Sequence, residues 1–314
     1  MSTPNASDSA WFSGFAPAKL NVRLKVRGRR ADGYHLLSML NVPLGLRDTV
    51  RIRFSPQNRD SCTCHGPYGP SSGEPTDNSV LKMANLFRAH IGAVRHVECE
   101  IDKQIPVQAG LGGGSSDAAT ALLLLEALFQ RELSPAQRQM LAAKAGSDVS
   151  YFLWSKPAWV RGVGEVVEPI ELGWLNGWPC ALIIPSFGLS TAQVYAQLRY
   201  GPWQEFAAGA DASLDAVGLT GASASAASFF DACIENDLLE AAIELEPRLS
   251  AILRAANGIA ALRNGMTGSG SALFSLPLDR HQGVEELFNR LEATVQPLGA
   301  RCLRTQIVWN HPTR

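Results

Sequence analysis

A glycine-rich segment at residues 106–119, with the sequence PVQAGLGGGSSDAA, constrains this chain more than any other feature. Glycine adopts backbone conformations that are closed to other residues and lets the chain approach a ligand closely. The segment leads into an apolar run at residues 116–131 that we predict to be a helix. Backbone amides and the positive end of the helix dipole would then point at one place, which favours a phosphate group. The glycine pattern alone is equally compatible with a flexible loop before a packed helix.

This loop differs from the two common nucleotide-binding motifs. It lacks the Gly-Lys-Ser/Thr ending of a Walker A loop, and its spacing does not fit the dinucleotide fingerprint. A second glycine segment at residues 265–271, GMTGSGS, is far away in the sequence and can close over the same ligand. Near the start of the chain, Lys19 lies on a predicted strand with Asn21 on the same face. Taken alone, Lys19 also fits an ordinary surface lysine.

Hydrophobic periodicity and turn residues predict helices and strands in both halves of the chain, and therefore an α+β fold in two layers. The predicted strands lie at residues 15–26, 34–46, 49–54, 97–101, 181–185, 272–276 and 301–308, with a hairpin at 157–167. The predicted helices lie at residues 78–90, 116–131, 135–145, 236–255 with a break near Pro247, and 281–295. Residues 149–154 are predicted to be an extended or short buried segment. A loop is expected at 57–77 and a partly mobile surface segment at 203–229.

The length of 314 residues suits two domains better than one. Trp, Pro and Gly accumulate at residues 168–177. We therefore expect a disordered tail at 1–14, an N-terminal domain at 15–170 and a C-terminal domain at 171–314.

Charge and hydropathy exclude several classes of partner. The formal net charge of −1 provides no global field that would attract nucleic acid or anionic lipid. The start of the chain lacks the basic and apolar regions of a secretory signal, and no apolar run is long enough to cross a bilayer. We therefore expect a cytoplasmic protein without a nucleic-acid or membrane partner.

The six cysteines do not form a disulfide framework in a chain of this length. Cys62, Cys64 and His65 lie close together and raise the hypothesis of a zinc site. A structural zinc usually needs four ligands in two spaced pairs, and no second pair lies nearby. Ordinary loop cysteines are the better interpretation.

Three ordered segments resemble the three motifs of the GHMP kinases. They are residues 16–21 with the sequence APAKLN, residues 110–119, and residues 265–271. The resemblance spans nearly the whole chain. It implies a two-domain fold, with a left-handed βαβ unit in the N-terminal ATP-binding domain and a ferredoxin-like C-terminal domain. It also implies an active site between the two domains.

A narrower resemblance points to the diphosphocytidyl-methylerythritol kinase branch. Residues 28–35, GRRADGYH, resemble a signature of that branch, as do residues 110–117, 146–149 and 161–165. This implies ATP-dependent phosphorylation of the 2-hydroxyl of 4-diphosphocytidyl-2-C-methyl-D-erythritol, in the non-mevalonate (MEP/DOXP) route to isoprenoid precursors. The alternatives are another GHMP kinase, acting on homoserine, a sugar or a mevalonate intermediate, and a non-catalytic nucleotide-binding homologue.

The resemblance implies that Asp148 is the catalytic carboxylate and that Lys19 lies beside it. A neighbouring cation keeps a carboxylate ionised and able to accept or orient a hydroxyl proton. Taken alone, Asp148 also fits a turn-forming aspartate after Gly146. Ser150 stands where relatives commonly have proline, which we expect to loosen the loop that holds Asp148.

The remaining site residues follow from matching positions. The residues implied to bind ATP are Asn78, Lys103, Pro106, Gly110, Leu111, Gly112, Gly113, Gly114, Ser115 and Ser116. Those implied to bind the acceptor substrate are Asn21, Tyr34, His35, Tyr195, Thr267 and Gly268. Tyr34 and Tyr195 would stack on the cytosine of a substrate that carries a cytidine diphosphate group, and His35 would contact its edge. Mg²⁺ is expected with ATP, with Ser116 as a candidate ligand only. A monomer or a homodimer is expected.

Overall fold

The computed structural model describes residues 10–69, 78–198 and 225–309. The first half of the chain is built on two long antiparallel strands, β1 (Phe12–Arg29) and β2 (His35–Phe54). Strand β4 (Val97–Asp102) pairs antiparallel with β2, and β3 (Ser61–His65) pairs parallel with β4. The parallel pair is joined through α1 (Ser79–Ile91), which forms a βαβ unit. The hairpin of β5 (Ala158–Gly162) and β6 (Val166–Pro169) pairs with β2 through β5.

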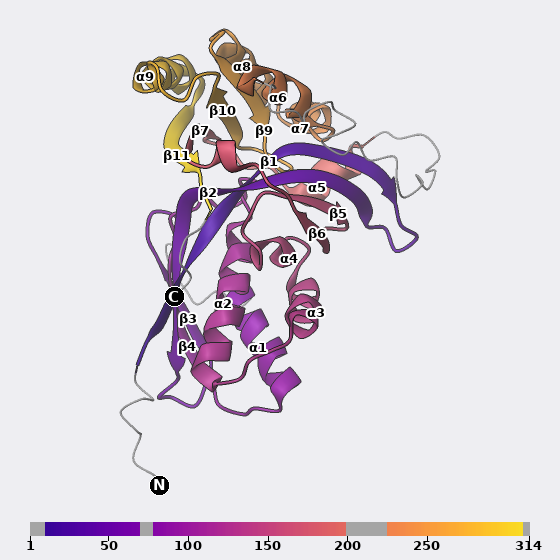
Figure 1. The fold of residues 1–314 in the computed structure, drawn as a ribbon, viewed down its shortest axis with the longest axis vertical. Coiled ribbons are helices and arrows are strands. Elements are labelled where there is room, and N and C mark those ends of the chain that lie inside the picture. The colour runs from indigo at the N-terminus through magenta and orange to yellow at the C-terminus, as the bar shows by residue number, and fades with distance from the viewer. Residues whose placement is uncertain (1–9, 70–77, 199–224, 310–314) are drawn as a thin grey trace.

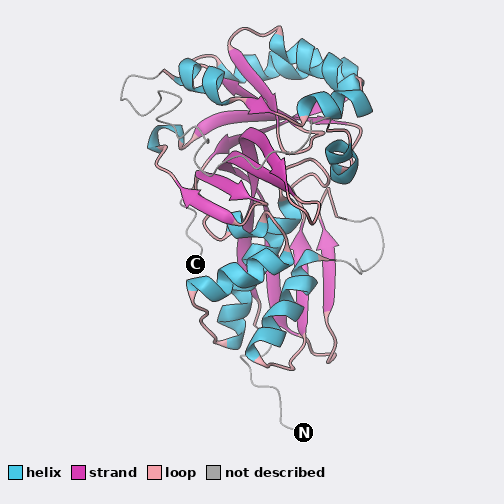
Figure 2. Ribbon diagram, turned by 90° about the vertical axis from the view of Figure 1, so that its right-hand side faces the viewer, coloured by secondary structure: helices cyan, strands magenta, loops and turns pink. Residues whose placement is uncertain are grey.

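Four helices lie on one face of this sheet, as Figures 1 and 2 show. They are α1, α2 (Gly113–Phe129), α3 (Pro135–Ala145) and the short α4 (Val149–Phe152). Asn78 caps α1 by accepting from the Val80 backbone N–H at 2.8 Å. Helix α3 begins with a capping box between Ser134 and Gln137.

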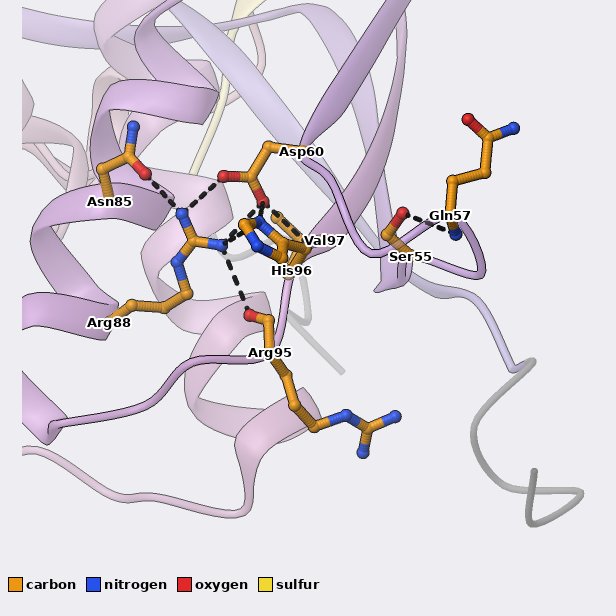
Figure 3. A network of polar contacts seen from close by, with 8 residues as sticks. All are labelled: Ser55, Gln57, Asp60, Asn85, Arg88, Arg95, His96 and Val97. Atoms are coloured by element: carbon orange, nitrogen blue, oxygen red, sulfur yellow. Dashed lines mark hydrogen bonds and ion pairs between the residues drawn. The ribbon is translucent and has the colours of Figure 1, made fainter. Parts of the chain in front are cut away.

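A polar cluster fastens α1 to the β3–β4 edge of the sheet (Figure 3). Arg88 of α1 binds Asp60 through both guanidinium nitrogens, at 2.7 and 2.5 Å. The Val97 backbone N–H donates to the same carboxylate at 2.9 Å. Burial alone would raise the pKa of Asp60, but the hydrogen bonds from Arg88 and Val97 lower it. This bidentate pair therefore holds the βαβ unit closed.

The second half contains a four-stranded antiparallel sheet with the spatial order β11-β7-β10-β9. Its strands are β7 (Trp178–Pro185), β9 (Leu262–Met266), β10 (Leu273–Pro277) and β11 (Ala300–Ile307). The helices between β7 and β9 are α5 (Thr191–Ala196), α6 (Ala226–Cys233), α7 (Leu239–Leu245) and α8 (Arg248–Asn257), and α9 (Val284–Val295) precedes β11. Short elements η2 (Gly173–Leu175), β8 (Glu235–Asn236) and η3 (Gln296–Leu298) complete the described chain. This strand order, with helices after the first and third strands, confirms the ferredoxin-like prediction.

The two halves share an apolar core between their sheets. Along β7, Leu182 and Ile184 pack into this shared core, whereas Ala181 and Ile183 pack under the helices. Along β1, Ala18, Leu20 and Val22 belong to the shared core as well. Because strand side chains alternate, Lys19 and Asn21 are left on the opposite face of β1. Sheet continuity comes from β2 and β11, which pair at Leu44 and Ile307.

Several predicted boundaries were wrong. Strand β1 begins at Phe12, so residues 12–14 are part of the sheet rather than of a tail. Aromatic contacts hold this end, because Arg51 and Arg53 lie over the Trp11 ring at 4.7 and 4.4 Å. The predicted runs at 34–46 and 49–54 are one continuous strand. Residues 1–9 lie outside the described chain.

Other elements were not predicted, because their formation depends on contacts with distant parts of the chain. Strand β3 lies inside the predicted loop at 57–77, where its Ser, Cys and His composition gives little local indication of a strand. Helix α5 and strand β9 were not predicted. The predicted mobile segment at 203–229 lies outside the described residues up to position 224, and its end belongs to α6. The predicted break near Pro247 is confirmed between α7 and α8. None of the helices in the described ranges is long and apolar enough to cross a membrane.

Candidate active site

The two glycine segments meet backbone to backbone. Gly110 has a φ of 73°, and a Cβ atom on it would lie 2.2 Å from the Thr267 carbonyl oxygen. A Cβ on Gly268 would lie 3.0 Å from the Gly110 Cα. The Thr267 hydroxyl accepts from the Asn21 backbone N–H at 3.0 Å and donates to the Gly110 carbonyl at 3.4 Å. The fold therefore places both segments and strand β1 together, as their use of one ligand requires.

Helix α2 begins at Gly113, three residues earlier than predicted, so the first loop is shorter than its glycine content indicates. Its first helical hydrogen bond runs from the Ser116 N–H to the Gly112 carbonyl at 2.9 Å. The N–H groups of Gly113, Gly114 and Ser115 precede that bond and lack partners within the helix. Gly112 at the N-cap has no side chain to satisfy them. Free amides at a helix N-terminus and the helix dipole both favour an anion at this position.

Lys19 and Asp148 lie beside this helix end. The Lys19 ammonium is 3.8 Å from an Asp148 carboxylate oxygen, and the Lys19 side chain is 4% exposed. The Lys19 backbone N–H donates to the Leu111 carbonyl at 3.0 Å, which ties the strand to the glycine loop. A Cβ on Gly112 would lie 3.0 Å from the Lys19 Cγ. Burial lowers the pKa of Lys19, and the nearby Asp148 carboxylate only partly offsets that effect.

Asp148 lies at the N-cap of the short helix α4 and is 30% exposed, so its carboxylate is open to an incoming ligand. Ser150 and Tyr151, in the middle of α4, are fully buried. Within the described chain neither hydroxyl makes a hydrogen bond. Burial raises the pKa of Tyr151 well above its ordinary value, with a further contribution from Asp148. The segment with Ser150 is thus short and buried, one of the two alternatives expected for residues 149–154, and its conformation is helical rather than extended.

Asn21 joins Lys19 to the neighbouring strand. The Lys19 ammonium donates to the Asn21 side-chain oxygen. The Asn21 amide nitrogen donates to the Asn41 side-chain oxygen at 2.6 Å and to the Met39 sulfur at 3.4 Å. Asn21 and Asn41 are directly opposite each other in the β1–β2 register. The sequence indicated that Lys19 and Asn21 share a face, but not that Asn41 completes the chain of contacts.

Lys103 has a buried position that its sequence pattern did not indicate. Its ammonium binds Asp48, and it binds Asp117 at 2.7 Å. Asp48 also accepts from the backbone N–H groups of Gln104 and Ile105, at 2.6 and 2.8 Å. Burial alone would lower the pKa of Lys103, but the two carboxylates raise it. Burial raises the pKa of Asp117 to about 7, although Lys103 acts in the opposite direction.

This ion triad lies directly beneath the first turn of α2. A Cβ on Gly113 would lie 3.4 Å from the Lys103 ammonium. In this structure the Lys103 side chain therefore supports the glycine loop from below, and a direct contact with ATP stays a prediction. Neither Asp48 nor Asp117 was assigned a role from the sequence.

The predicted cytosine residues come from both halves of the chain. His35 at the start of β2 packs against Tyr195 of α5, with ring centroids 4.8 Å apart and an angle of 33° between the rings. Tyr34, the neighbour of His35, is 63% exposed. Burial lowers the pKa of His35, and the Arg29 guanidinium lowers it further. A neutral His35 offers one nitrogen donor and one acceptor to a ligand.

The other predicted ATP-binding residues surround the same helix end. Pro106 and Leu111 are buried, whereas Gly114 is exposed. The Ser79 hydroxyl donates to the Gly114 carbonyl at 2.7 Å, so α1, which Asn78 caps, is joined to the loop. Ser116 is fully buried, and its hydroxyl makes no hydrogen bond within the described ranges.

Two cavities lie beside the glycine segments without including Lys19 or Asp148. One, of about 470 Å³, is lined by residues that include Val22, Asn236 and Met266. The other, of about 530 Å³, lies between Ala109 and Ile184. Asn236 donates to the carbonyls of Met266 and Gly268 at 2.8 and 2.9 Å, and so holds the second glycine segment in place.

Comparison with known proteins identifies relatives of this chain. The family model for the GHMP kinases N terminal domain matches residues 78–156. A 4-diphosphocytidyl-2-C-methyl-D-erythritol kinase of Protochlamydia amoebophila (strain UWE25) is 34% identical over 263 residues, which cover 83% of each chain. A kinase of the same name from Burkholderia orbicola (strain MC0-3) is 32% identical over 267 residues, 85% of this chain and 86% of the relative.

Solved structures agree with these relatives. A crystal structure of 4-(cytidine 5'-diphospho)-2C-methyl-D-erythritol kinase is 30% identical, with a TM-score of 0.68 over 94% of this chain and 99% of that chain. Homoserine kinase from Cytophaga hutchinsonii has a TM-score of 0.71 over 98% and 97% of the two chains, at 14% identity. That second likeness is one of fold alone.

Proposed function

Because the chain belongs to the 4-diphosphocytidyl-2-C-methyl-D-erythritol kinase family of GHMP kinases, we propose that it transfers the γ-phosphoryl group of ATP to the 2-hydroxyl of 4-diphosphocytidyl-2-C-methyl-D-erythritol. The products would be ADP and the 2-phosphate, in the non-mevalonate route to isoprenoid precursors. It is a kinase, uses ATP and acts on a small molecule.

One observation supports the proposal above all: a buried ammonium and an open carboxylate lie 3.8 Å apart at the end of α2, where two glycine segments meet. Phosphoryl transfer needs little covalent chemistry from the protein, since positioning and electrostatic stabilisation supply most of the catalysis. The free amides of α2 suit the phosphates, and Asp148 suits the acceptor hydroxyl. The amides and the carboxylate would therefore bring the phosphate donor and the acceptor hydroxyl close to each other.

We assign Asp148 the task of accepting or orienting the proton of the acceptor hydroxyl. An aspartate does this when it is ionised and within hydrogen-bonding reach of the proton. The Lys19 ammonium lies 3.8 Å from this carboxylate and places a positive charge beside the acceptor hydroxyl. When protonated, Lys19 also opposes the negative charge that develops on the acceptor oxygen.

Mg²⁺ would accompany ATP and neutralise charge on its β- and γ-phosphates. The buried Ser116 hydroxyl lies in the first turn of α2 and makes no hydrogen bond within the described chain, so it fits an oxygen ligand of this kind. Its partners would include phosphate oxygens and water, since Mg²⁺ usually keeps several waters. We name Ser116 as the candidate and no other ligand.

Selection of the cytidine group would come from Tyr34, His35 and Tyr195. The His35–Tyr195 contact joins β2 to α5, and exposed Tyr34 offers a free aromatic face next to it. Stacking combined with hydrogen bonds at the ring edge is a general way to select a base. Asn21, which binds the Lys19 ammonium, and Thr267, whose hydroxyl accepts from the Asn21 backbone N–H, would contact the polyol and the transferred group.

Further parts of the proposal concern the whole protein. We place the domain boundary at residues 170 and 171, between β6 and β7. A cytoplasmic location and a monomer or homodimer would agree with a small-molecule kinase of this family.

A turnover assay with three acceptors tests the function. ADP release should be fast with the diphosphocytidyl substrate and negligible with homoserine and mevalonate. CDP should compete with the acceptor, since a kinase for homoserine or mevalonate has no reason to bind cytidine. Equal turnover of all three acceptors, or turnover of homoserine alone, would overturn the assignment. Absence of turnover with each of them in the presence of Mg²⁺ would favour a non-catalytic homologue.

A further inference from the structure

Asn41 is a buried polar residue that is linked to Lys19 through one intervening side chain, that of Asn21. It sits on β2, directly opposite Asn21, and its side chain is 1% exposed. Its side-chain oxygen accepts from the Asn21 amide nitrogen at 2.6 Å. The Asn41 amide nitrogen makes no hydrogen bond within the described residues. Burying an amide with an unsatisfied donor costs about 1–3 kcal/mol, so apolar packing would be the more stable choice at this position.

The contacts of Asn21 show how Asn41 affects the orientation of the Asn21 side-chain amide. An asparagine amide can present either its oxygen or its nitrogen in a given direction. The Asn21 nitrogen has two acceptors on β2, the Asn41 oxygen and the Met39 sulfur at 3.4 Å. The Asn21 oxygen is then turned toward the Lys19 ammonium, which donates to it. The reverse orientation would place an NH₂ group against a cation.

Asn41 dominates that choice, because thioether sulfur is a weak acceptor. Without the Asn41 oxygen, little would hold the Asn21 amide in one orientation. Lys19 would lose an acceptor while remaining buried, and burial disfavours its charged form. Of the charged side chains in the described structure, Asp148 is the one that acts on Lys19. The backbone partners of Lys19, the Leu111 carbonyl and Pro43 opposite it on β2, carry no charge.

We propose that Asn41 is a positioning residue for the phosphoryl transfer: it orients the Asn21 amide so that the Asn21 oxygen holds the Lys19 ammonium in place beside Asp148. The role of Lys19 in turnover rests on the proposed function. The orientation of Asn21 does not, and it can be tested separately.

Asn41→Leu removes the acceptor at nearly constant volume, and Asn41→Asp keeps an acceptor oxygen. We expect Asn41→Leu to lower kcat about 10- to 100-fold, the usual effect of a hydrogen bond to a charged group, with KM for ATP changed less than about twofold. The alkaline limb of the kcat–pH profile should move to lower pH. Asn41→Asp should restore kcat to within about threefold and place that limb at or above the wild-type pH.

A merely structural role predicts a different pattern. It would lower the melting temperature of both Asn41→Leu and Asn41→Asp. The alkaline limb of the kcat–pH profile would not then move in opposite directions in the two variants. Ser38→Ala is the matched control, because Ser38 is buried on the same strand and distant from Lys19 in register. It should leave kcat and the limb unchanged. If Asn41→Leu does not fold, Asn41→Ser is used, because its short side chain cannot reach Asn21.

A second measurement is independent of the substrate. The pKa of Lys19 is followed by NMR through the ¹³Cε chemical shift in protein made with ¹³C-labelled lysine, with Lys19→Arg to assign the signal. We expect the Lys19 pKa to fall in Asn41→Leu or Asn41→Ser. In a protein that already carries Asn21→Ala, the same substitutions of Asn41 should leave the Lys19 pKa unchanged. An unchanged Lys19 pKa, or equal loss of kcat in the leucine and aspartate variants, overturns the proposal. Failure of wild-type protein to use the diphosphocytidyl substrate would instead overturn the proposed function, and the titration of Lys19 would still decide the role of Asn41.

Discussion

Gly110 and Thr267 are 157 residues apart in the sequence, yet the Thr267 hydroxyl donates to the Gly110 carbonyl at 3.4 Å. The backbones lie so close that a Cβ on Gly110 would be 2.2 Å from the Thr267 carbonyl oxygen. This contact joins the N-terminal and C-terminal halves at the end of α2. Glycine is required there both for its φ of 73° and for space.

Gly110→Ala should therefore separate the two glycine segments. A methyl group cannot fit, so Thr267 and the loop must move apart by more than an ångström. We expect kcat/KM to fall about 100-fold or more, since misplacement of this size costs that much in active sites. Steady-state kinetics with varied ATP measures the effect.

Gly283→Ala is the matched control for backbone strain. Gly283 has a φ of 61°, and a Cβ on it would meet no atom within 4 Å. It should cost about 1–2 kcal/mol of stability, the penalty for a left-handed residue, and leave kcat/KM unchanged. Equal kinetic losses in the two variants would argue against a special role for the Gly110–Thr267 contact.

Asp148→Asn should remove most turnover and leave ATP binding nearly intact. The substitution keeps the shape of the side chain but removes its charge, so the acceptor hydroxyl loses its proton acceptor. We expect kcat to fall about 10²- to 10⁴-fold, the usual contribution of a general base. Single-turnover kinetics and the Kd for ATP separate the two effects. A variant with near-normal turnover would contradict the assigned role.

Lys19 should set an alkaline limit to activity. Burial lowers the pKa of Lys19 below its ordinary value of 10.5, so the ammonium loses its proton at lower pH than an exposed lysine does. The charged form helps catalysis, and kcat should therefore decrease as the pH rises through this pKa. Lys19→Arg should have lower kcat, because of its different shape, but no alkaline limb, since arginine stays protonated. An unchanged limb in Lys19→Arg would show that another group causes it.

Asp117 should make stability depend on pH. Its folded pKa of about 7 lies above the ordinary value of 3.8. Its contribution to stability is therefore complete below the unfolded value and is lost as the pH rises through the folded value. Asp117→Asn cannot ionise, so the free energy of unfolding of the variant relative to wild type should increase by about 2–3 kcal/mol between pH 5 and pH 8.

Urea unfolding at pH 5 and pH 8 measures this difference. Lys103→Met is the companion variant, because it leaves two buried carboxylates without their cation. It should destabilise the protein by about 3–5 kcal/mol near pH 8. Parallel pH dependence in wild type and Asp117→Asn would contradict the prediction.

Tyr195 should affect the acceptor and not ATP. Tyr195→Ala removes the ring that packs on His35 at 4.8 Å, whereas Tyr195→Phe keeps it. We expect KM for the diphosphocytidyl substrate to rise about 10-fold in the alanine variant, the usual effect of losing one stacking contact, and to change little in the phenylalanine variant. KM for ATP should stay constant in both. An equal rise of both KM values would show that Tyr195 supports the fold instead.

Local sequence predicted most elements whose residues carry their own pattern. Helices α1 and α3 have side-chain caps, and the predicted break near Pro247 is present in the structure. Strand β3 was missed, because its pairing with β4 depends on a partner more than 30 residues away in the printed sequence. Helix α2 was predicted to start too late, since glycine gives no local indication of a helix.

By itself the sequence determined the two glycine turns, the strand that carries Lys19 and the turn that carries Asp148, because each depends on the residues within one short segment. Only the tertiary structure decided which side chains meet. Lys103 lies between Asp48 and Asp117, and Asn41 contacts Asn21, through strand register and helix packing. Such contacts join residues from separate segments, and their energies come from burial and exact distance, which no local pattern contains.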